Sequence, residues 1–245
     1  MLGIIAAMNE ELDAVIATAT IERIVEVGGR RFHVGELHGH RVVLVVCRIG
    51  KVAAATTTTI LLERFAVHSI IFTGLAGGVA AQLRVGDIVI ADELIHHDLD
   101  VRPLFPQYEV PLLGAAHLPT DAALRQRLHQ AADHFVTALP TAVVALGITA
   151  PTVHRGVVAS GDQFFASLEA VTALRTALPN VLAVEMEGAA VAQVCIEHAL
   201  PFAIVRVISD SADHSAGVAF EAFLQHACGA YAAGIVGPFM QQLQK

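Results

Sequence analysis

The sequence predicts an α/β fold built around a mixed sheet, on three observations. Short runs rich in Val and Ile recur without polar alternation, which is typical of strands covered on both faces. Helical patterns lie between several of these runs, and one N-terminal region instead has the pattern of a meander. The unalternating runs are Leu2–Ala7, Val42–Cys47, Ser69–Thr73, Asp87–Ala91, Gly156–Ser160, Val181–Met186 and Phe202–Ile208.

The meander is predicted after the first strand. Glu22–Val27, Arg31–Leu37 and Arg41–Cys47 read as strands, separated by Gly28-Gly29 and by Gly39. Glycine turns of this length join antiparallel neighbours. We therefore expect antiparallel strands at one end of an otherwise parallel sheet.

Two helices are predicted from apolar stripes. Asp121–Val136 repeats apolar residues at helical spacing, and Thr120 is its expected N-cap. Val218–Ala233 has a similar stripe and is expected to end at the glycines and proline of 234–238.

Composition excludes some classes of protein. The chain has 245 residues, 55% of them hydrophobic, and a net charge of −8, so a disordered chain is excluded. Lys51 and Lys245 are the only lysines, which argues against a nucleic-acid partner. No Pro-, Gly- or Ser-rich linker interrupts the chain, so residues 1–245 are expected to form a single domain.

Neither a membrane span nor a secretory signal is expected. The uncharged stretches Phe65–Leu83 and Phe135–Val153 are interrupted by glycines or prolines, and the apolar start meets Glu10 and Glu11 at once. The expected location is the cytoplasm. Cys47, Cys195 and Cys228 are odd in number and widely spaced, so we assign them neither a disulfide nor a metal, and we expect no cofactor.

Polar residues follow six of the predicted strands. In open α/β sheets ligands bind beyond the carboxyl ends of the strands, so these segments are expected to meet in one acidic site. The segments are Met8–Glu11, Thr73–Gly78, His97–Asp100, Ser160–Phe165, Glu185–Gly188 and Ser209–Asp213.

Each segment also has a plainer interpretation. Glu10-Glu11 fits a helix's first turn as well as it fits catalysis, and a tight strand-exit turn is favoured over a phosphate cradle for Thr73–Gly78. A solvated loop is favoured over a metal site for His96–Asp100, and a core position over a ligand contact for Phe164-Phe165.

Glu187 and Asp210 are harder to explain as surface acids. Each directly follows an apolar run, and a buried carboxylate needs a partner. Arg206 lies on the same strand face as Asp210 and is its expected ion partner.

Short motifs follow one another in a defined order and spacing over about residues 3 to 213. They are Met8–Glu11, Ile49–Ala54, Thr73-Gly74 with Ala76–Gly78, Gly86–Val89, Ser160–Asp162, Val184–Glu187 and Val205–Asp210. Together these motifs resemble the 5′-methylthioadenosine/S-adenosylhomocysteine nucleosidases, within the nucleoside phosphorylase and hydrolase superfamily. The resemblance implies a three-layer αβα sandwich around a mixed central sheet.

The resemblance also implies roles. Glu11 would activate the attacking water, Asp210 would protonate N7 of adenine, and Glu187 would hold the ribose hydroxyls. Cleavage of an N-glycosidic bond passes through a cationic sugar, which agrees with three acids in these roles. We expect like-charge repulsion and partial burial to raise the pKa of Asp210, while Glu187 stays ionised as it accepts hydroxyl bonds.

The remaining pocket residues are likewise implied by the resemblance. Phe164 would stack on the purine, and the backbone of Phe165 would read its edge. Ser209 would orient Asp210, and Met186 would line the ribose floor. Ile49 and Gly77 would complete the pocket, and Arg206 would help to position the water.

The chain departs from the family pattern at three places. Leu75 stands where better-known bacterial nucleosidases have Ser, and Asn9 replaces an acid common beside the catalytic Glu. Segment 100–111 also differs; it is the loop expected to reach a neighbouring subunit's pocket in a homodimer.

Three rival functions remain open. A phosphorylase of the same superfamily is disfavoured, because the carboxylates of Met8–Glu11 would repel phosphate. A futalosine or aminofutalosine hydrolase shares the glycosidic chemistry. A nucleoside-binding module without turnover is disfavoured by the joint presence of Glu11, Glu187 and Asp210.

Overall fold

The computed structural model describes residues 1–212 and 216–243. The strands are β1 (Leu2–Ala6), β2 (Thr20–Val27), β3 (Arg30–Leu37), β4 (His40–Val46), β5 (Ser69–Gly78), β6 (Ile88–His96), β7 (Leu118–Pro119), β8 (Val153–Ser160), β9 (Val181–Glu185) and β10 (Phe202–Asp210). The helices are α1 (Asn9–Ile16), α2 (Lys51–Phe65), α3 (Ala122–Val136), α4 (Thr141–Val144), α5 (Leu168–Ala177), α6 (Gly188–Glu197), α7 (Ala216–His226) and α8 (Cys228–Gln241). The expected Ser209–Asp213 segment extends into the part outside this description at Asp213.

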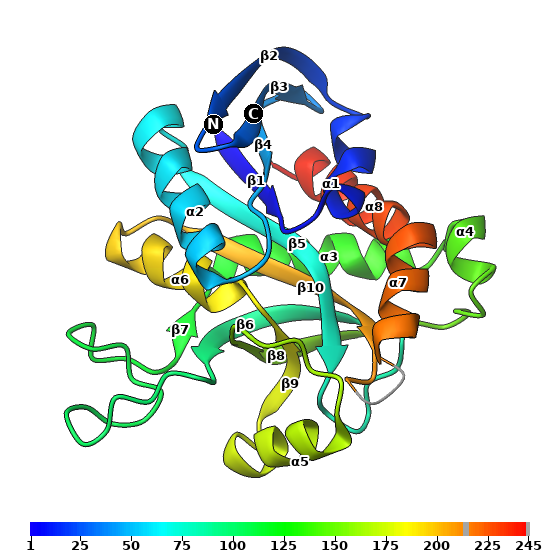
Figure 1. Ribbon diagram of the computed structural model, residues 1–245. Coiled ribbons are helices and arrows are strands. Elements are labelled where there is room, and N and C mark those ends of the chain that lie inside the picture. The colour runs from blue at the N-terminus through cyan, green and yellow to red at the C-terminus, as the bar shows by residue number, and fades with distance from the viewer. Residues whose placement is uncertain (213–215, 244–245) are drawn as a thin grey trace.

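The strands of the described residues form one mixed sheet (Figure 1). Its order is β10-β6-β8-β9-β5-β1-β4-β3-β2, with β7 beside β6. Strand β10 also pairs with β5 in parallel, so β5, β10, β6, β8 and β9 close into a ring. The predicted meander is confirmed as the antiparallel strands β2, β3 and β4 at the open end.

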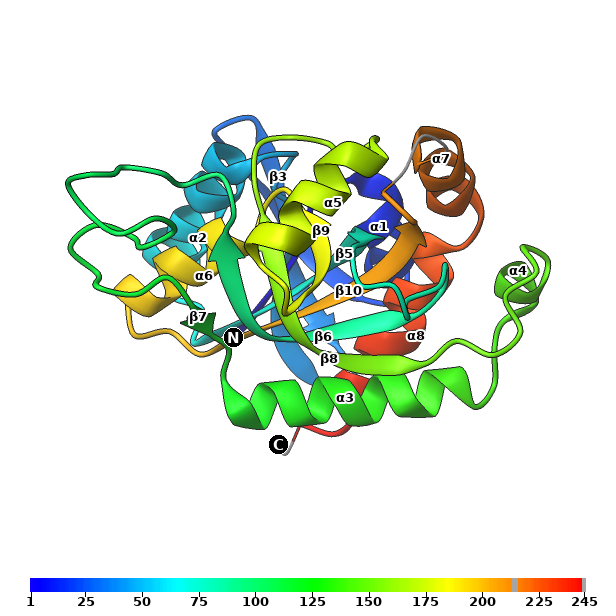
Figure 2. The same cartoon turned by 90° about the horizontal axis from the view of Figure 1, so that it is seen from below.

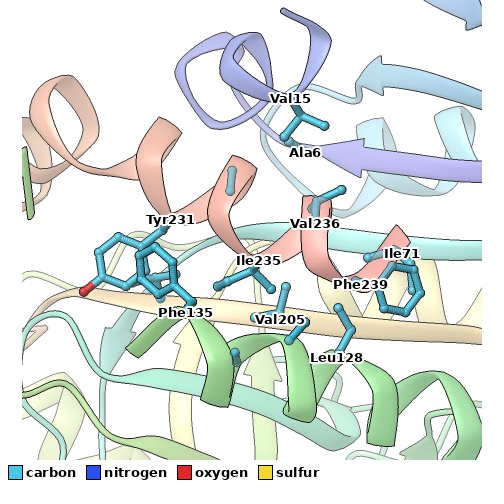
Figure 3. Close-up of a cluster of buried hydrophobic side chains, with 14 of the residues drawn as sticks. Ala6, Val15, Ile71, Leu128, Phe135, Val205, Tyr231, Ile235, Val236 and Phe239 are labelled. Carbon is cyan, nitrogen blue, oxygen red and sulfur yellow. The ribbon is translucent and has the colours of Figure 1, made fainter. Parts of the chain in front are cut away.

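Helices cover both faces of the sheet, which confirms the predicted α/β layout. Ile4 of β1 belongs to the apolar core under α1, α3 and α8, whereas its neighbour Ile5 belongs to the core under α2 and α6. Figure 2 shows α3 and α5 on opposite sides of the strands of the ring. In Figure 3, Val205 of β10 lies between Leu128 of α3 and Ile235 of α8.

The glycine segment after Thr73 is a strand, so the predicted strand-exit turn is wrong. Strand β5 runs on to Gly78, pairing with β10 as far as Gly77 and with β9 at Gly77 and Gly78. Backbone pairing on both edges holds the segment extended despite its glycines. The glycines instead let neighbouring side chains approach the strand closely.

Both predicted helices exist, with corrections at their ends. The first is capped by Asp121, whose side chain accepts a hydrogen bond from the Leu124 N–H at 2.8 Å. Thr120 is not the cap, because its hydroxyl donates to the Ala91 carbonyl.

The predicted C-terminal helix is two helices that meet at Ala227. Its predicted end at 234–238 is wrong, since α8 continues to Gln241 with Pro238 inside it. Gly234 lets the Phe135 ring pack against α8, because a Cβ added to Gly234 would lie 2.4 Å from that ring. In residues 1–212 and 216–243, none of the helices is long and apolar enough to cross a membrane.

Candidate active site

A pocket lies where the strands of the ring end. Its space, including the open mouth, is about 650 Å³, within the usual range for small-molecule sites. Every candidate site residue from the sequence lines it except Arg206. The lining residues are Ala7, Met8, Glu11, Ile49, Leu75, Ala76, Gly77, Gln163, Phe164, Phe165, Val184, Glu185, Met186, Glu187, Ser209, Asp210 and Phe220.

Glu11 enters the pocket from the first turn of α1. One carboxylate oxygen accepts the N–H groups of Ala7 and Met8, both at 2.9 Å, and the other accepts the N–H of Leu75 at 3.0 Å. The residue is 3% exposed, and this burial raises the pKa of Glu11 against the opposing effect of Arg206 and the three hydrogen bonds. Glu11 is thus an acid in the first turn of α1, as one interpretation of the sequence expects, and it also lines the pocket. Its catalytic role stays a prediction.

Glu187 precedes the first turn of α6. Its Oε1 accepts the N–H of Gly50 at 2.7 Å, which joins it to the turn before α2. Burial, followed by the charge of Glu185, raises the pKa of Glu187 to about 8. Without substrate, this pKa favours the protonated form of Glu187 at neutral pH. The expectation that Glu187 stays ionised while it accepts the ribose hydroxyls concerns the substrate-bound site and stays a prediction.

Asp210 ends β10 and is held from two sides. Its Oδ2 accepts the hydroxyl of Ser209 at 2.7 Å, and its Oδ1 accepts the N–H of Ala212 at 2.8 Å. The residue is 2% exposed. A Cβ on Gly77 would approach Oδ1 to 3.2 Å, so the glycine of β5 leaves room for this carboxyl group.

Aromatic rings form one wall. Phe164 is 47% exposed and meets Phe220 of α7 edge to face, with ring centroids 5.7 Å apart. Phe165 is buried and packs against the edge of His97. The favoured core assignment therefore fits Phe165 and not Phe164, although both rings line the pocket.

Arg206 is buried behind the pocket and forms its salt bridge with Glu185. Its Nη2 lies 2.5 Å from Oε2 of Glu185, and the two side chains are 1% and 3% exposed. The ion partner expected from sequence, Asp210, is thus wrong. The sequence argument assumed regular alternation along β10, but the register shifts between Ile208 and Asp210. Arg206 reaches Glu185 of β9, whereas Asp210 is held by its own neighbours.

Sequence reasoning placed Glu185 in a segment expected at the site but gave it no role, and it missed Phe220 as a pocket residue. Arg206 within an otherwise apolar strand was a usable signal for Glu185, because a buried guanidinium requires a carboxylate. No local signal marks Phe220, whose spacing matches the core stripe of its helix.

The histidine segment is partly buried, contrary to the favoured solvated loop. His96 ends β6 and is 5% exposed, with its Nε2 at 3.2 Å from Gln193. Among residues 1–212 and 216–243, no group of three His, Cys, Asp or Glu side chains is placed to hold a metal ion.

Comparisons with known proteins agree with this fold and pocket. A family model described as the phosphorylase superfamily matches residues 1–236. The 5′-methylthioadenosine/S-adenosylhomocysteine nucleosidase of Anoxybacillus flavithermus is 42% identical over 227 residues, which is 92% of each chain.

Solved structures agree over the whole chain. A nucleosidase of the same name from Neisseria meningitidis, in complex with methylthio-immucillin-A, has a TM-score of 0.87 at 36% identity and 99% coverage of both chains. A futalosine hydrolase of Helicobacter pylori has a TM-score of 0.86 at 31% identity, over 99% of this chain and 97% of the other. This chain belongs to the phosphorylase superfamily and, within it, to the 5′-methylthioadenosine/S-adenosylhomocysteine nucleosidase family.

Proposed function

We propose that the protein hydrolyses the N-glycosidic bond of 5′-methylthioadenosine, S-adenosylhomocysteine or both, releasing adenine and the thioribose product. The observation that carries this proposal is the convergence of Glu11, Glu187 and Asp210 on one pocket with an aromatic wall. The relatives carry the same activity in their names, and the Neisseria structure holds methylthio-immucillin-A.

Glu11 is the proposed general base. Its raised pKa makes it a stronger base than an exposed glutamate, and its three backbone donors fix its direction. A proton of the attacking water passes to Glu11 while the oxygen bonds to C1′ of the ribose. The electron pair of the C1′–N9 bond leaves with the purine.

Asp210 is the proposed general acid. It gives a proton to N7 of the departing adenine, and Ser209 and the Ala212 N–H hold its carboxyl group in place. Phe164 stacks on the purine and the Phe165 backbone reads its edge, with Ile49 and Gly77 completing the pocket. These steps add OH to the sugar and H to the base, so water is consumed and no cofactor is required.

Glu187 is the proposed ribose ligand, above a floor formed by Met186. Hydroxyl donors and a cationic sugar both favour the carboxylate form, so substrate is expected to lower the pKa of Glu187 from about 8. The raised value leaves Glu187 protonated until those donors and that charge arrive.

A futalosine or aminofutalosine hydrolase is the second candidate, because the Helicobacter pylori futalosine hydrolase covers the same chain at 31% identity. It would share the glycosidic chemistry and differ at the 5′ end of the substrate. A phosphorylase is disfavoured by the buried carboxylates, which repel phosphate.

A substrate panel tests these alternatives. Methylthioadenosine, S-adenosylhomocysteine, adenosine, inosine and aminofutalosine are assayed for free base, each with and without phosphate. We expect adenine from the first two without phosphate. Release that depends on phosphate would assign a phosphorylase, and release from aminofutalosine alone would assign the second candidate.

We further propose that residues 1–245 act as one cytoplasmic domain in a homodimer, with loop 100–111 completing the partner's pocket. Within the described chain, no side chain of this loop lines the chain's own pocket. Leu104 in the loop is 81% exposed, which supports an apolar contact outside the chain.

A further inference from the structure

The salt bridge behind the pocket leaves part of Arg206 unused. Both Nε and Nη2 donate to Oε2 of Glu185, at 3.2 and 2.5 Å. The third nitrogen, Nη1, is buried and has no hydrogen-bond partner in the described residues. The guanidinium also lies over the Phe72 ring, with Cζ 3.9 Å from the ring centroid. Its position is thus set by one carboxylate and one ring, while one donor remains free.

Nη1 of Arg206 and the carboxylate of Glu11, the proposed general base, face the same space beside Gly74. A Cβ built on Gly74 would lie 2.8 Å from Nη1 of Arg206 and 3.0 Å from Oε1 of Glu11. The missing side chain of Gly74 therefore leaves a small space between a donor and a carboxylate oxygen. Arg206 is close enough to lower the pKa of Glu11, and it acts on Glu187 in the same way.

Glu185 is itself held rigidly. Its carboxylate accepts the Ser160 hydroxyl and the N–H groups of Glu187 and Gly188 at the start of α6. Ser160 is fixed in turn by the Ala189 N–H at 2.7 Å. These donors hold the carboxylate group of Glu185 in one position at the start of α6.

We propose that Glu185 is a positioning residue that acts through Arg206. As the counterion of the guanidinium, it keeps Nη1 directed into the space beside Gly74 and prevents Arg206 from forming its ion pair with Glu11 or Glu187. Glu11 thereby keeps its basicity, and Nη1 stays available beside it. This inference rests on the proposed function, because it assigns Glu185 a part in the same hydrolysis.

The charges around Glu185 and Glu187 define what removal of Glu185 would do. The ionisable groups that interact with them are Glu11 from α1, Cys47 after β4, His96 and His97 at the end of β6, and Arg206 from β10. Without Glu185, the guanidinium has only Glu11 and Glu187 as carboxylate partners in this group. An ion pair with either carboxyl group would lower the pKa of that group, and a pair with Glu11 would weaken the proposed base.

The test compares Glu185→Gln with the wild-type enzyme on methylthioadenosine. Glutamine keeps the size and the acceptor oxygen and removes the charge. We expect kcat to fall about 100-fold, as for a misplaced catalytic group, with KM within about threefold. The acidic limb of the kcat profile should also move to lower pH, since the neighbouring carboxyl groups lose their protons more easily.

A double-mutant cycle separates positioning from general damage. Because Glu185 acts through Arg206, kcat of the double variant Glu185→Gln/Arg206→Gln should lie within about threefold of kcat of Arg206→Gln alone. The matched control is Asp87→Asn. Asp87 is also a buried carboxylate, 1% exposed, but it lies outside the pocket. The substitution should lower the melting temperature while leaving kcat within about twofold of wild type.

The outcomes are distinct. If kcat of Glu185→Gln stays within threefold of wild type, or if the two substitutions multiply in the cycle, the positioning role is wrong. If the wild-type enzyme itself releases no adenine, the proposed function fails instead. Should Glu185→Gln not fold, Ser160→Ala decides: a fall of about tenfold in kcat at constant KM supports the role, and an unchanged kcat overturns it.

Discussion

At the scale of single residues, the buried acids of the pocket differ through their partners. Glu11 is raised in pKa mainly by burial, and Glu187 by burial together with a second carboxylate. Glu185 sits against Arg206, so the guanidinium is neutralised locally. One positive charge among these carboxylates gives each a different environment, which is how similar side chains can take different parts in one reaction.

Asp210→Asn should abolish adenine release. The amide cannot transfer a proton to N7, yet it keeps the size of the carboxyl group and its contact with Ser209. Affinity for methylthioadenosine should stay within about tenfold of wild type, since binding does not need that proton. Turnover by HPLC and affinity by calorimetry check this, and wild-type turnover in the variant would rule out Asp210 as the acid.

The raised pKa of Glu187 predicts how stability depends on pH. Its pKa is about 8 when folded and near the model-compound value of 4.5 when unfolded, so the folded state holds a proton that the unfolded state has released. Between these values stability falls as pH rises, by at most on the order of 1 kcal/mol per pH unit for one proton.

Glu187→Gln removes this dependence. The variant should therefore gain stability relative to wild type as the pH rises from 5 to 8. Urea unfolding at pH 5, 6.5 and 8 measures the difference. If the difference in unfolding free energy between the two proteins stays constant from pH 5 to 8, the raised pKa of Glu187 is contradicted.

At the scale of elements, β5 is the strand that brings the acids together. It pairs with β1, β9 and β10, and its extended backbone passes beside Glu11, Arg206 and Asp210. Gly74 leaves room for Arg206 and Glu11, and Gly77 leaves room for Asp210. The glycines of β5 therefore serve the pocket by their lack of Cβ and not by forming a turn.

Gly74→Ala should damage catalysis. Its methyl group would come within 2.8 Å of Arg206 Nη1 and 3.0 Å of Glu11 Oε1, so one of these groups must move. We expect kcat of Gly74→Ala to fall about 100-fold. Steady-state kinetics with methylthioadenosine measure this fall.

Gly217→Ala is the matched control for that substitution. A Cβ there meets no atom within 4 Å, so kcat should stay within about twofold, and helix α7 should gain about 0.5–1 kcal/mol. Equal losses in both variants would mean that the space beside Gly74 has no special role.

At the scale of the whole molecule, closure of the ring positions the site. Because β10 pairs with β5 on one edge and β6 on the other, the end of β10 lies beside the ends of β5 and β9. Residues nearly 200 positions apart, such as Glu11 and Asp210, therefore line one pocket. Loop 100–111 extends beyond this body and carries the proposed contact with a second copy (Figure 1).

Leu104→Asp tests that contact. The wild-type protein should sediment at twice the mass of one chain, and the variant should shift toward one chain because a charge is placed in an apolar interface. KM for methylthioadenosine should rise about tenfold as the pocket loses the partner's loop. Val144→Asp, at another exposed apolar residue, should change neither quantity, and a monomeric wild type would refute the dimer.

Local patterns predicted most elements, because each depends on near neighbours in sequence. Apolar runs located β1, β4, β8, β9 and β10, and glycine turns located the meander. Errors arose where distant contacts decided: pairing with β9 and β10 kept β5 extended through its glycines, and Phe135 gave Gly234 a packing role inside α8.

The sequence by itself determined the α/β class, the meander and the carboxylates at the strand ends, since burial and periodicity are written into the order of residues. Only the tertiary structure decided that Arg206 pairs with Glu185 and that Glu187 is raised in pKa. The physical reason is that ion pairing and desolvation depend on distances in space. Closure of β10 onto β5 sets those distances, and no local pattern encodes them.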